Sequence, residues 1–330
     1  MKEIAVVILN WNGKELLQKF LPAVVQHSNQ AQIYVIDNAS TDDSVAFLQT
    51  NFPEVHLIQN QQNLGYAGGY NQGLKQVKEP IYCLINSDVL VTENWLAPIL
   101  KLLGEQPEIG IVQPKILDYK RRNYFEYAGA AGGFIDAYGF PFCRGRVFDT
   151  IEKDEGQYND ITPVFWASGA CFFVRKSVFE QLNGFDTLFF AHQEEIDFCW
   201  RAHIHNIQVY YCGFSTVYHV GGATLSNGNP KKTFLNFRNS LLMLYKNRPK
   251  KGKFINIFMR LSLDGLAGIH FLLKGKPQHC WAIVRSHFSF YRLISQSAVN
   301  PNAIKYYRVK SVVWTYFIRR KKTFLQIKSP

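Results

Sequence analysis

The first 115 residues alternate between short apolar runs and stretches with helical spacing, and this alternation limits the folds open to the chain. The apolar runs predict strands at residues 4–9, 33–37, 56–59 and 81–86. Helical spacing follows them at residues 13–26, from Ser40 or Thr41 to residue 51, at 71–77 and at 96–103. Strand–helix alternation builds a mostly parallel sheet with helices on both faces. We therefore predict an α/β fold whose ligands bind at the carboxyl ends of the strands.

The pattern changes after residue 118. Residues 118–165 are rich in glycine and aromatic residues and have weak periodicity, which predicts loops and short antiparallel strands. We expect further strands at 169–175, 209–211 and 216–219, the last two at a sheet edge, and a helix at 195–206. From residue 234 the spacing is helical.

The charge divides the chain near residue 230. Residues 1–230 hold 16 Lys and Arg against 24 Asp and Glu, whereas residues 231–330 hold 21 basic residues against one acid. The basic part also places apolar residues at helical spacing, namely Phe254, Ile257, Phe258, Leu261 and Leu272. Such a helix suits an anionic membrane interface, because aliphatic stripes add little to phosphate binding. We expect a body over residues 1–230 and a basic, mostly helical, membrane-associating tail over 231–330, with a packed helical subdomain as the alternative for part of it.

Three further features bear on location. The longest candidate for a membrane span, residues 254–273, is interrupted by Arg260, Asp264 and His270, so we expect no uninterrupted span. The N-terminus has an apolar run without a cleavage site and is interpreted as a strand. Six scattered cysteines without a CxxC pair indicate buried thiols in a reducing compartment, with a zinc site or disulfides as the lesser alternative.

Polar residues stand at the carboxyl ends of the predicted strands. Asp88 follows the fourth strand, where a carboxylate can hold a divalent metal that takes its other ligands from diphosphate and water; an ordinary turn aspartate is the alternative. Asp37 ends the second strand and can accept the ring N–H of a pyrimidine base, with a turn and helix cap as the alternative. The residues at the carboxyl ends of the first, second and fourth predicted strands are Asn10-Trp11-Asn12, Asp37-Asn38-Ala39-Ser40 and Asn86-Ser87-Asp88.

Two further segments and one histidine carry candidate chemistry. The glycines of residues 63–71 let backbone amides approach an anionic or sugar ligand, although the segment is no dinucleotide fingerprint. Glu194 and Glu195 begin a helix, where carboxylates often serve only the helix dipole. In a cleft, however, their repulsion raises the proton affinity of one, which suits a general base. A lone residue such as His219 is more often structural than a ligand.

In this order and spacing, these motifs together resemble the family 2 glycosyltransferases, most of all their bacterial rhamnosyltransferase-type branch. The resemblance covers about residues 3–248, including Arg238-Asn239-Ser240 and Tyr245-Lys246-Asn247. It implies a single Rossmann-like nucleotide-diphospho-sugar transferase domain of the GT-A type. Nucleotide-sugar binding would occupy about residues 1–115 and the acceptor side about residues 116–230.

The resemblance also implies roles for single residues. Asp88 would be the metal-binding carboxylate of the Asp-x-Asp motif, whose first Asp is here Asn86, and His219 would assist it in holding Mg²⁺ or Mn²⁺. The family's Glu-Asp pair falls on Glu194 and Glu195, so Glu195 is the expected base and Glu194 its alternative. Asp37 would contact uracil or thymine. The other expected donor contacts are Asn10, Asn12, Asn38, Ser40, Asn63, Gly65, Tyr66, Gly68, Asn71, Asn86 and Ser87, and those expected on the acceptor side are Trp166 and Gly169.

The implied activity is an inverting transfer from a dTDP- or UDP-sugar, with dTDP-rhamnose among them, to a hydroxyl of a saccharide or lipid-linked saccharide in cell-surface polysaccharide synthesis. The expected location is cytoplasmic, at the inner face of the cell membrane, with an anionic membrane surface and no nucleic acid as partner. A sugar nucleotidyltransferase is an alternative, but residues 10–13 lack its Gly-, Arg- and Lys-bearing loop. A catalytically inactive membrane- or nucleic-acid-binding protein is another, against which the Asp88, Glu195 and His219 set argues.

Overall fold

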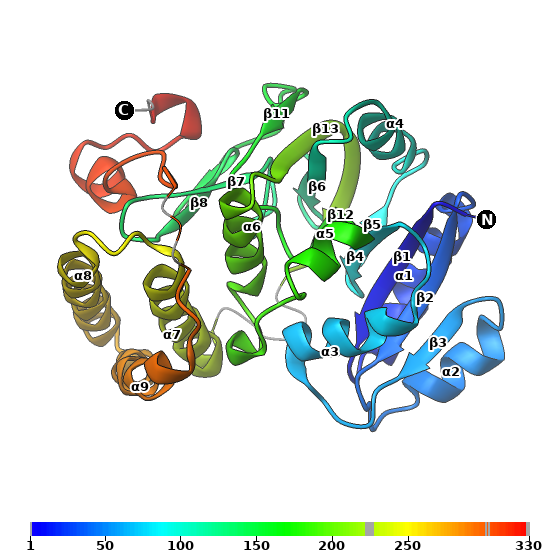
Figure 1. The fold of residues 1–330 in the computed structure, drawn as a ribbon, viewed down its shortest axis with the longest axis horizontal. Helices are drawn as coiled ribbons and strands as arrows, with labels where there is room; N and C mark the ends of the chain where they lie inside the picture. Colours follow the sequence, from blue (N-terminus) through cyan, green and yellow to red (C-terminus); the bar gives the residue numbers. More distant parts are fainter. Residues whose placement is uncertain (1, 222–227, 301, 303, 328–330) are drawn as a thin grey trace.

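The computed structural model describes residues 2–221, 228–300, 302 and 304–327 (Figure 1). Its first strands are parallel and stand in the order β3, β2, β1, β4, so the chain reverses its winding between β1 and β4. Ligands of open α/β sheets bind at such a reversal. The elements are β1 (Ile4–Asn10), α1 (Lys14–His27), β2 (Ala31–Asp37), α2 (Ser44–Asn51), β3 (His56–Gln59), α3 (Gly65–Gly73) and β4 (Ile81–Asn86).

The sheet continues past β4 with β12 (Cys171–Arg175), β6 (Ile109–Asp118), β13 (Gln208–His219) and β11 (Ile161–Pro163). Strand β12 runs antiparallel to β4 and β6, β13 runs parallel to β6, and β5 (Val89–Val91) pairs with β13. Helices α4 (Ala97–Glu105), α5 (Lys176–Gln181) and α6 (Glu194–Ile204) complete this part. The predicted α/β class with a mostly parallel central sheet is confirmed.

The sequence patterns misplace three elements. The two predicted edge strands are one strand, β13, which lies inside the sheet between β11 and β6; a register shift between Cys212 and Thr216 interrupts its alternation. Helix α3 begins at Gly65 and not at residue 71, because its glycines serve close packing although they weaken helix propensity. Helix α2 begins at Ser44, and the Ser40 hydroxyl accepts hydrogen bonds from Asn10 and Asn12 and caps no helix.

The glycine-rich middle segment forms a second, small sheet. Its strands are antiparallel, as predicted for residues 118–165, and stand in the order β10, β9, β8, β7. They are β7 (Gly133–Ile135), β8 (Pro141–Cys143), β9 (Arg146–Val147) and β10 (Thr150–Ile151).

The C-terminal region is helical, as predicted, with α7 (Pro230–Asn247), α8 (Lys253–Leu273) and α9 (Pro277–Leu293) at the left in Figure 1. Helix α7 is no loose appendage: residues 241–244 are buried in the same hydrophobic cluster as Phe172 and Trp200 of the body. The core therefore crosses residue 230, and a division there stays a prediction drawn from charge.

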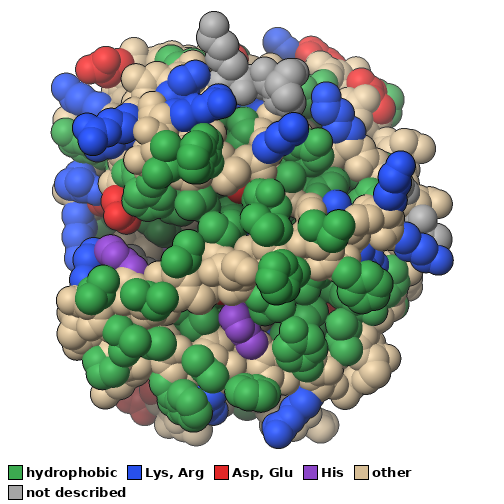
Figure 2. All heavy atoms as spheres, turned by 90° about the vertical axis from the view of Figure 1, so that its left-hand side faces the viewer, with side chains coloured by type: hydrophobic (Ala, Val, Ile, Leu, Met, Phe, Trp, Pro, Cys, Tyr) green, Lys and Arg blue, Asp and Glu red, His purple; other side chains and the backbone are tan. Residues whose placement is uncertain are grey.

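Helix α8 is long and apolar enough to cross a membrane by length and composition, and it is the one such helix among the described residues. This differs from the expectation that residues 254–273 are too interrupted for a span. Arg260 and Asp264 are buried within the protein, so they do not interrupt the outward side of the helix. Figure 2 looks onto the face that contains this helix and shows many hydrophobic side chains there.

Candidate active site

Buried polar side chains join the carboxyl ends of β1 and β2. The Nδ2 atom of Asn10 donates to Oδ1 of Asp37 at 3.1 Å and to Oγ of Ser40 at 3.2 Å. The backbone N–H of Ser40 donates to Oδ2 of Asp37 at 2.9 Å. Asn12 completes the cluster, because its side-chain oxygen accepts a hydrogen bond from the backbone N–H of Thr41 at 2.7 Å. The structure thus brings together four of the predicted donor-binding residues.

Asn38 is the centre of a second cluster on the same edge. Its Nδ2 donates to Oδ1 of Asn63 and to the carbonyl oxygen of Gly65, both at 3.0 Å. Gly65 has φ +69°, and a Cβ there would lie 2.5 Å from the carbonyl oxygen of Phe190. At Gly68 a Cβ would lie 2.7 Å from Leu64 Cβ. These glycines are therefore required for packing, and donor binding by their amides stays a prediction.

Tyr66 and Asn71 reach from α3 toward the predicted acceptor side. The Tyr66 hydroxyl donates to the carbonyl oxygen of Gly169 at 2.8 Å. The Asn71 side chain donates to the Phe185 carbonyl at 2.7 Å and accepts from the Phe185 N–H at 2.9 Å. Both side chains tie α3 to segments over a hundred residues away. Their contact with a donor stays a prediction.

Asp88 and His219 lie side by side, because β5 pairs with the end of β13. Nε2 of His219 is 3.1 Å from Oδ1 of Asp88, and Nδ1 is 3.4 Å from Oε1 of Glu126. Burial lowers the pKa of His219, but the two carboxylates outweigh it and raise that pKa to about 10. Burial likewise opposes the ionisation of Asp88, yet the His219 imidazolium holds the pKa of Asp88 below its ordinary value.

This pair fits a divalent ion that arrives with a diphosphate. Asp88 offers one oxygen, and His219 offers one nitrogen at the same point once a bound ion displaces the Nε2 proton; Mg²⁺ or Mn²⁺ takes its remaining ligands from phosphate and water. Glu126 faces the far ring nitrogen, where a carboxylate commonly orients a metal-binding histidine. Within the described part of the chain, no group of three or more His, Cys, Asp and Glu side chains is arranged to hold a metal.

Helix α6 begins with Glu194 and Glu195, and the residues around them are strained and unpaired. Phe190, His192 and Gln193 have φ values of +62°, +70° and +72°, which non-glycine residues rarely adopt. The buried atoms Nε2 of His192, Oε1 of Gln193, and Oε2 of both glutamates make no hydrogen bond to any residue that the structure describes. Such atoms are costly in a folded protein, and four in consecutive residues are typical of a catalytic or binding segment.

The two glutamates differ in their proton affinity. Burial and the neighbouring Glu195 raise the pKa of Glu194 well above its ordinary value. Burial raises the pKa of Glu195 to about 7, where hydrogen bonds from backbone amides oppose a larger shift. A general base works best with a pKa near the operating pH. A pKa near 7 suits Glu195 to that role, and the choice of Glu195 over Glu194 stays a prediction.

Gly169 lies between the glutamates and the end of β4. A Cβ at Gly169 would lie 3.2 Å from the Tyr66 hydroxyl and 3.8 Å from Cδ of Glu195. The adjacent Ala170 accepts a hydrogen bond from the Asn86 N–H at 2.9 Å. Segment 169–170 therefore lies next to both the predicted base and the strand end that precedes Asp88. Ser87 is half-buried in that same turn.

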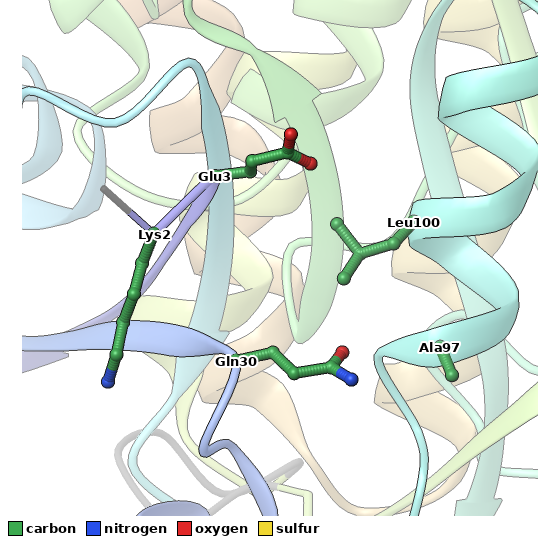
Figure 3. Close-up of a pocket in the computed structure, with 5 residues that line it drawn as sticks. All are labelled: Lys2, Glu3, Gln30, Ala97 and Leu100. Carbon is green, nitrogen blue, oxygen red and sulfur yellow. The ribbon is translucent and has the colours of Figure 1, made fainter.

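One pocket lies away from the predicted site residues (Figure 3). It has a volume of about 440 Å³ and is lined by Lys2, Glu3, Gln30, Ala97 and Leu100. Lys2, Glu3 and Gln30 precede β1 and β2, at the opposite end of these strands from Asn10 and Asp37, and the other two residues belong to α4. None of the predicted site residues lines this pocket.

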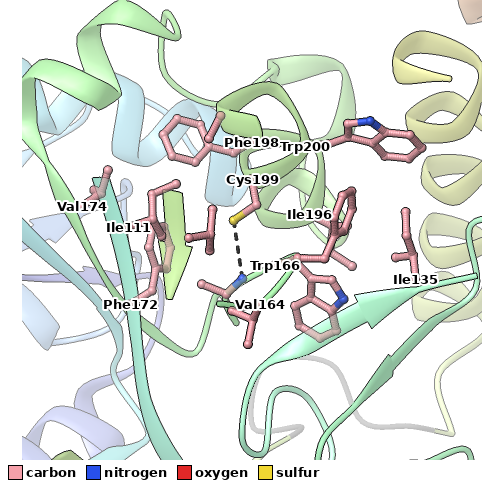
Figure 4. Close-up of a cluster of buried hydrophobic side chains, with 14 of the residues drawn as sticks. Ile111, Ile135, Val164, Trp166, Phe172, Val174, Ile196, Phe198, Cys199 and Trp200 are labelled. Atoms are coloured by element: carbon pink, nitrogen blue, oxygen red, sulfur yellow. Dashed lines mark hydrogen bonds between the residues drawn. The ribbon is translucent and has the colours of Figure 1, made fainter. Parts of the chain in front are cut away.

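Trp166, predicted on the acceptor side, is part of the core beneath α6 (Figure 4). Its Nε1 donates to the Phe134 carbonyl at 3.0 Å. The next residue, Ala167, donates its N–H to Sγ of Cys199 on α6 at 3.4 Å. This core fixes the loop that leads to Gly169 against the helix that carries Glu195. Cys199 and the other five cysteines are free thiols.

Helix α7 holds the strained segment before Glu194. Nδ2 of Asn239 donates to the carbonyl oxygens of residues 189, 191 and 192 at 2.9, 2.8 and 2.7 Å, and Asn239 is fully buried. Arg238 donates to the carbonyls of residues 188 and 189. Lys246 of the same helix pairs with Asp197, which also forms an ion pair with Arg201 at 2.8 Å.

Sequence reasoning missed Glu126 and the function of Asn239. The Arg238-Asn239-Ser240 motif was available as part of the family resemblance, but nothing in it indicates which backbone it binds. Glu126 stands in a segment without periodicity, and only the fold brings it to His219.

Comparison with known proteins gives three kinds of match. A sequence profile described as Glycosyl transferase family 2 matches residues 5–182. The chain is 39% identical over 223 residues to Rhamnosyltransferase WbbL of Escherichia coli K12, which is 63% of this chain and 80% of that protein. It is 25% identical over 209 residues to the N-acetylglucosaminyl-diphospho-decaprenol L-rhamnosyltransferase of Mycobacterium tuberculosis, or 59% of this chain and 68% of that protein.

Two solved structures are similar in fold. The mannosyltransferase PcManGT from Pyrobaculum calidifontis, in complex with GDP-Man and Mn²⁺, matches 88% of this chain and 87% of its own with a TM-score of 0.55 and 13% identity. GalNAc-T7 with UDP, GalNAc and Mn²⁺ matches 74% of this chain with a TM-score of 0.58 and 14% identity, and the chain spans 48% of that protein. At these identities the likeness concerns the fold alone, and it confirms the predicted GT-A type.

Proposed function

This chain belongs to glycosyl transferase family 2, and we propose that it transfers a sugar from a nucleoside diphosphate to a hydroxyl of a saccharide or lipid-linked saccharide acceptor. The observation that carries the proposal is the meeting of Asp88, His219 and the Glu195 segment along one edge of the sheet. Asp88 and His219 would hold the metal ion that binds the donor diphosphate. Glu195 would accept the proton of the acceptor hydroxyl.

The proposed donor is a dTDP- or UDP-sugar, and dTDP-rhamnose is the first to test because two similar proteins bear the name rhamnosyltransferase. Asp37 would accept the ring N–H of the base, with Asn10 and Asn12 beside the nucleoside. Asn38, Asn63, Gly65 and the residues near them would line the sugar and diphosphate. Their clustering at the β1 and β2 ends supports this.

Asp88 and His219 would hold Mg²⁺ or Mn²⁺, and two solved neighbours of the same fold contain Mn²⁺ with a nucleotide or nucleotide sugar. When bound, such an ion neutralises the charge that builds on the leaving diphosphate. Glu126 would keep His219 in one orientation and one tautomer.

Glu195 would accept the proton of the acceptor hydroxyl while that oxygen attacks the anomeric carbon. The bond from the anomeric carbon to the diphosphate breaks at the same time, and its electron pair leaves with the nucleoside diphosphate. Attack from the face opposite the leaving group inverts the configuration in one displacement. The pKa near neutrality of Glu195 supports this assignment.

We propose that the acceptor is presented at the cytoplasmic face of the cell membrane during cell-surface polysaccharide synthesis. The name of the M. tuberculosis relative gives it a decaprenol-linked diphosphate acceptor, which supports a lipid-linked acceptor here. The basic C-terminal region supports an anionic membrane surface as partner in place of nucleic acid.

The test is incubation of the purified full chain with Mn²⁺ and single nucleotide sugars, with and without a polyprenyl-diphosphate-linked saccharide. We expect release of nucleoside diphosphate that depends on acceptor, and a product of inverted anomeric configuration by NMR. Formation of a nucleotide sugar from a nucleoside triphosphate and a sugar phosphate would instead identify a nucleotidyltransferase. Absence of both activities with every donor would refute the proposal.

A further inference from the structure

Helix α8 directs its charged residues inward. Its buried positions are spaced by three or four residues, as on one helix face, and two of them are Arg260 and Asp264. Nε of Arg260 donates to Oδ1 of Asp264 at 2.8 Å and Nη1 donates to the Tyr138 carbonyl at 3.2 Å. From α9, Nε2 of His287 lies 3.4 Å from Oδ2 of Asp264. The helix is therefore attached to the body through its polar side.

The opposite side of α8 is mostly apolar and exposed, and Ser262 and His270 are the exposed residues of the helix with polar side chains. Phe254 and Leu273 are 82% and 84% exposed, and Phe258 is 67% exposed. Within residues 253–273, all of which the structure describes, no exposed position carries Lys, Arg, Asp or Glu. A helix on a soluble surface has the reverse arrangement. The outward apolar residues of α8 are Phe254, Ile255, Phe258, Met259, Leu266, Ile269, Leu272 and Leu273.

Neighbouring elements extend this side into one surface, which we call the apolar face. Helix α9 adds Trp281, Phe288 and Tyr291, and the segment after it adds Trp314, Phe317 and Ile318, all more than half exposed. These elements line the left of the molecule in Figure 1, and Figure 2 shows their hydrophobic side chains with Lys and Arg mostly around the margin. Exposed apolar surface of this kind marks an interaction site.

The charges beside the apolar face are positive. Exposed basic residues flank α8 at both ends and follow Ile318, namely Lys250, Lys251, Lys274, Lys276, Arg319, Arg320 and Lys322. The one acid of residues 231–330 is Asp264, which is buried. A second copy of the chain would oppose positive charge to positive charge, whereas an anionic bilayer complements both the apolar side chains and the basic margin.

We propose that the apolar face lies in the interface of an anionic bilayer, with α8 parallel to the membrane plane. The bonds of Arg260 and of Asn256, whose Nδ2 donates to the Ala137 carbonyl at 3.1 Å, keep α8 on the body, so the helix lies in the interface and does not cross it. This inference rests on the proposed function in one respect: a lipid-linked acceptor would lie in the same membrane surface that the apolar face binds.

The apolar face is one helix away from the proposed base. Helices α8 and α9 both pack on α7, and α7 holds the backbone of residues 188–192 through Arg238 and Asn239. Docking on the bilayer therefore brings the segment before Glu195 close to an acceptor that stays in the lipid.

The test is flotation of the full chain with vesicles of equal parts phosphatidylglycerol and phosphatidylcholine, compared with phosphatidylcholine alone. Phe254→Glu/Phe258→Glu places two charges at the exposed centre of the face, and we expect vesicle partition to fall about tenfold or more because both rings leave the lipid. Phe214→Glu is the matched control, since Phe214 is 60% exposed on β13, and should float like the wild type. Neutral vesicles should bind the wild type more weakly.

The wild type, the double variant and Phe214→Glu should transfer sugar equally well to a water-soluble acceptor. If none of the three shows any transfer, the transferase proposal fails, and this result is independent of the flotation result. Equal flotation of the double variant and the wild type would overturn the inference. The inference would also be overturned if the wild type does not bind the vesicles but sediments as a dimer, while the double variant sediments as a monomer. That result would assign the apolar face to contact with a second copy of the chain.

Discussion

Nε2 of His219 lies 3.1 Å from Oδ1 of Asp88, so the end of β13 meets the turn after β4 at a single buried point. A buried carboxylate and a buried imidazolium both lose hydration, so each requires a charged partner: Asp88 has His219, and His219 has Asp88 and Glu126. The pair is attached to the frame of the sheet, since the Val220 N–H donates to the Asp88 carbonyl at 3.1 Å. Side chains of the pair can therefore be changed without loss of the fold.

We expect Asp88→Ala to lower transfer about 100- to 1,000-fold, because charge on the leaving diphosphate loses its stabilisation. Electron paramagnetic resonance of Mn²⁺ in the presence of nucleoside diphosphate should show weakened binding of the ion. Circular dichroism should be unchanged. Asp43→Ala is the control, since the Asp43 side chain is 77% exposed and pairs only with Lys14 among the described residues. Full activity of Asp88→Ala would contradict the assignment.

Glu126→Gln should weaken Mn²⁺ binding about 10- to 100-fold while leaving Asp88 and His219 in place, because the carboxylate that orients the imidazole is lost. The binding titration detects this effect independently of turnover. His219→Ala should also weaken binding. If Glu126→Gln binds Mn²⁺ as the wild type does, Glu126 serves only the hydrogen bond to the Ala128 N–H.

Glu195→Gln should reduce kcat about 100- to 10,000-fold with little change in donor binding, because the amide keeps the shape but accepts no proton. Glu194→Gln is the matched variant one residue away and should retain most activity, since burial and the neighbouring Glu195 raise the pKa of Glu194 and favour its neutral form. Single-turnover kinetics and calorimetric binding of nucleoside diphosphate separate the two quantities. Loss of activity in Glu194→Gln alone would move the base by one residue.

The pH dependence of kcat should have an acidic limb near pH 7. Burial raises the pKa of Glu195 to about 7, and only the deprotonated form accepts the acceptor proton, so activity is lost as the pH falls through that value. Glu195→Gln should abolish this limb in the residual activity. A limb near the ordinary glutamate pKa would mean that the carboxyl is hydrated in the working enzyme.

Asn239→Ala should lower kcat and shift the acidic limb to lower pH, because the segment before Glu194 loses three hydrogen bonds and admits water to Glu195. The carbonyl of residue 189 keeps the hydrogen bond from Arg238, whereas a buried carbonyl left unpaired at residue 191 or 192 costs about 1–3 kcal/mol, so the melting temperature falls as well. Asn256→Ala is the control: it removes one hydrogen bond to a carbonyl on the far side of α8. A loss of stability with an unchanged pH profile would limit Asn239 to a structural role.

Local patterns predicted the half of the site that follows parallel strands. Asn10, Asp37 and Asp88 each come directly after or at the end of an apolar run, and parallel strands place their carboxyl ends on one edge. The side chains at β1 and β2 therefore had to meet, and they do. Helical spacing also accounts for the ion pair of Asp197 with Arg201, which are four residues apart on α6.

Predictions were weaker for elements whose contacts are with residues far away in the sequence. The register shift in β13 concealed a single interior strand. The predicted start of α3 was six residues late, because the contact of Gly65 with Phe190 is not local in sequence. Trp166 shows the same limit: the family resemblance implied an acceptor-side role, which stays a prediction, whereas only the fold shows that its ring and N–H belong to the core under α6.

By itself the sequence determined the sheet edge that carries the site and the basic helical C-terminus, because periodicity, strand ends and charge are properties of neighbouring residues. Its motifs indicated the family through their resemblance in order and spacing. Only the tertiary structure decided that Glu126 stands behind His219, that Asn239 holds the segment before Glu194, and that α8 faces outward with its apolar side. A helical pattern defines which residues share a face. Which face is buried depends on partners such as Tyr138 and His287, whose approach depends on the free energy of the whole folded chain.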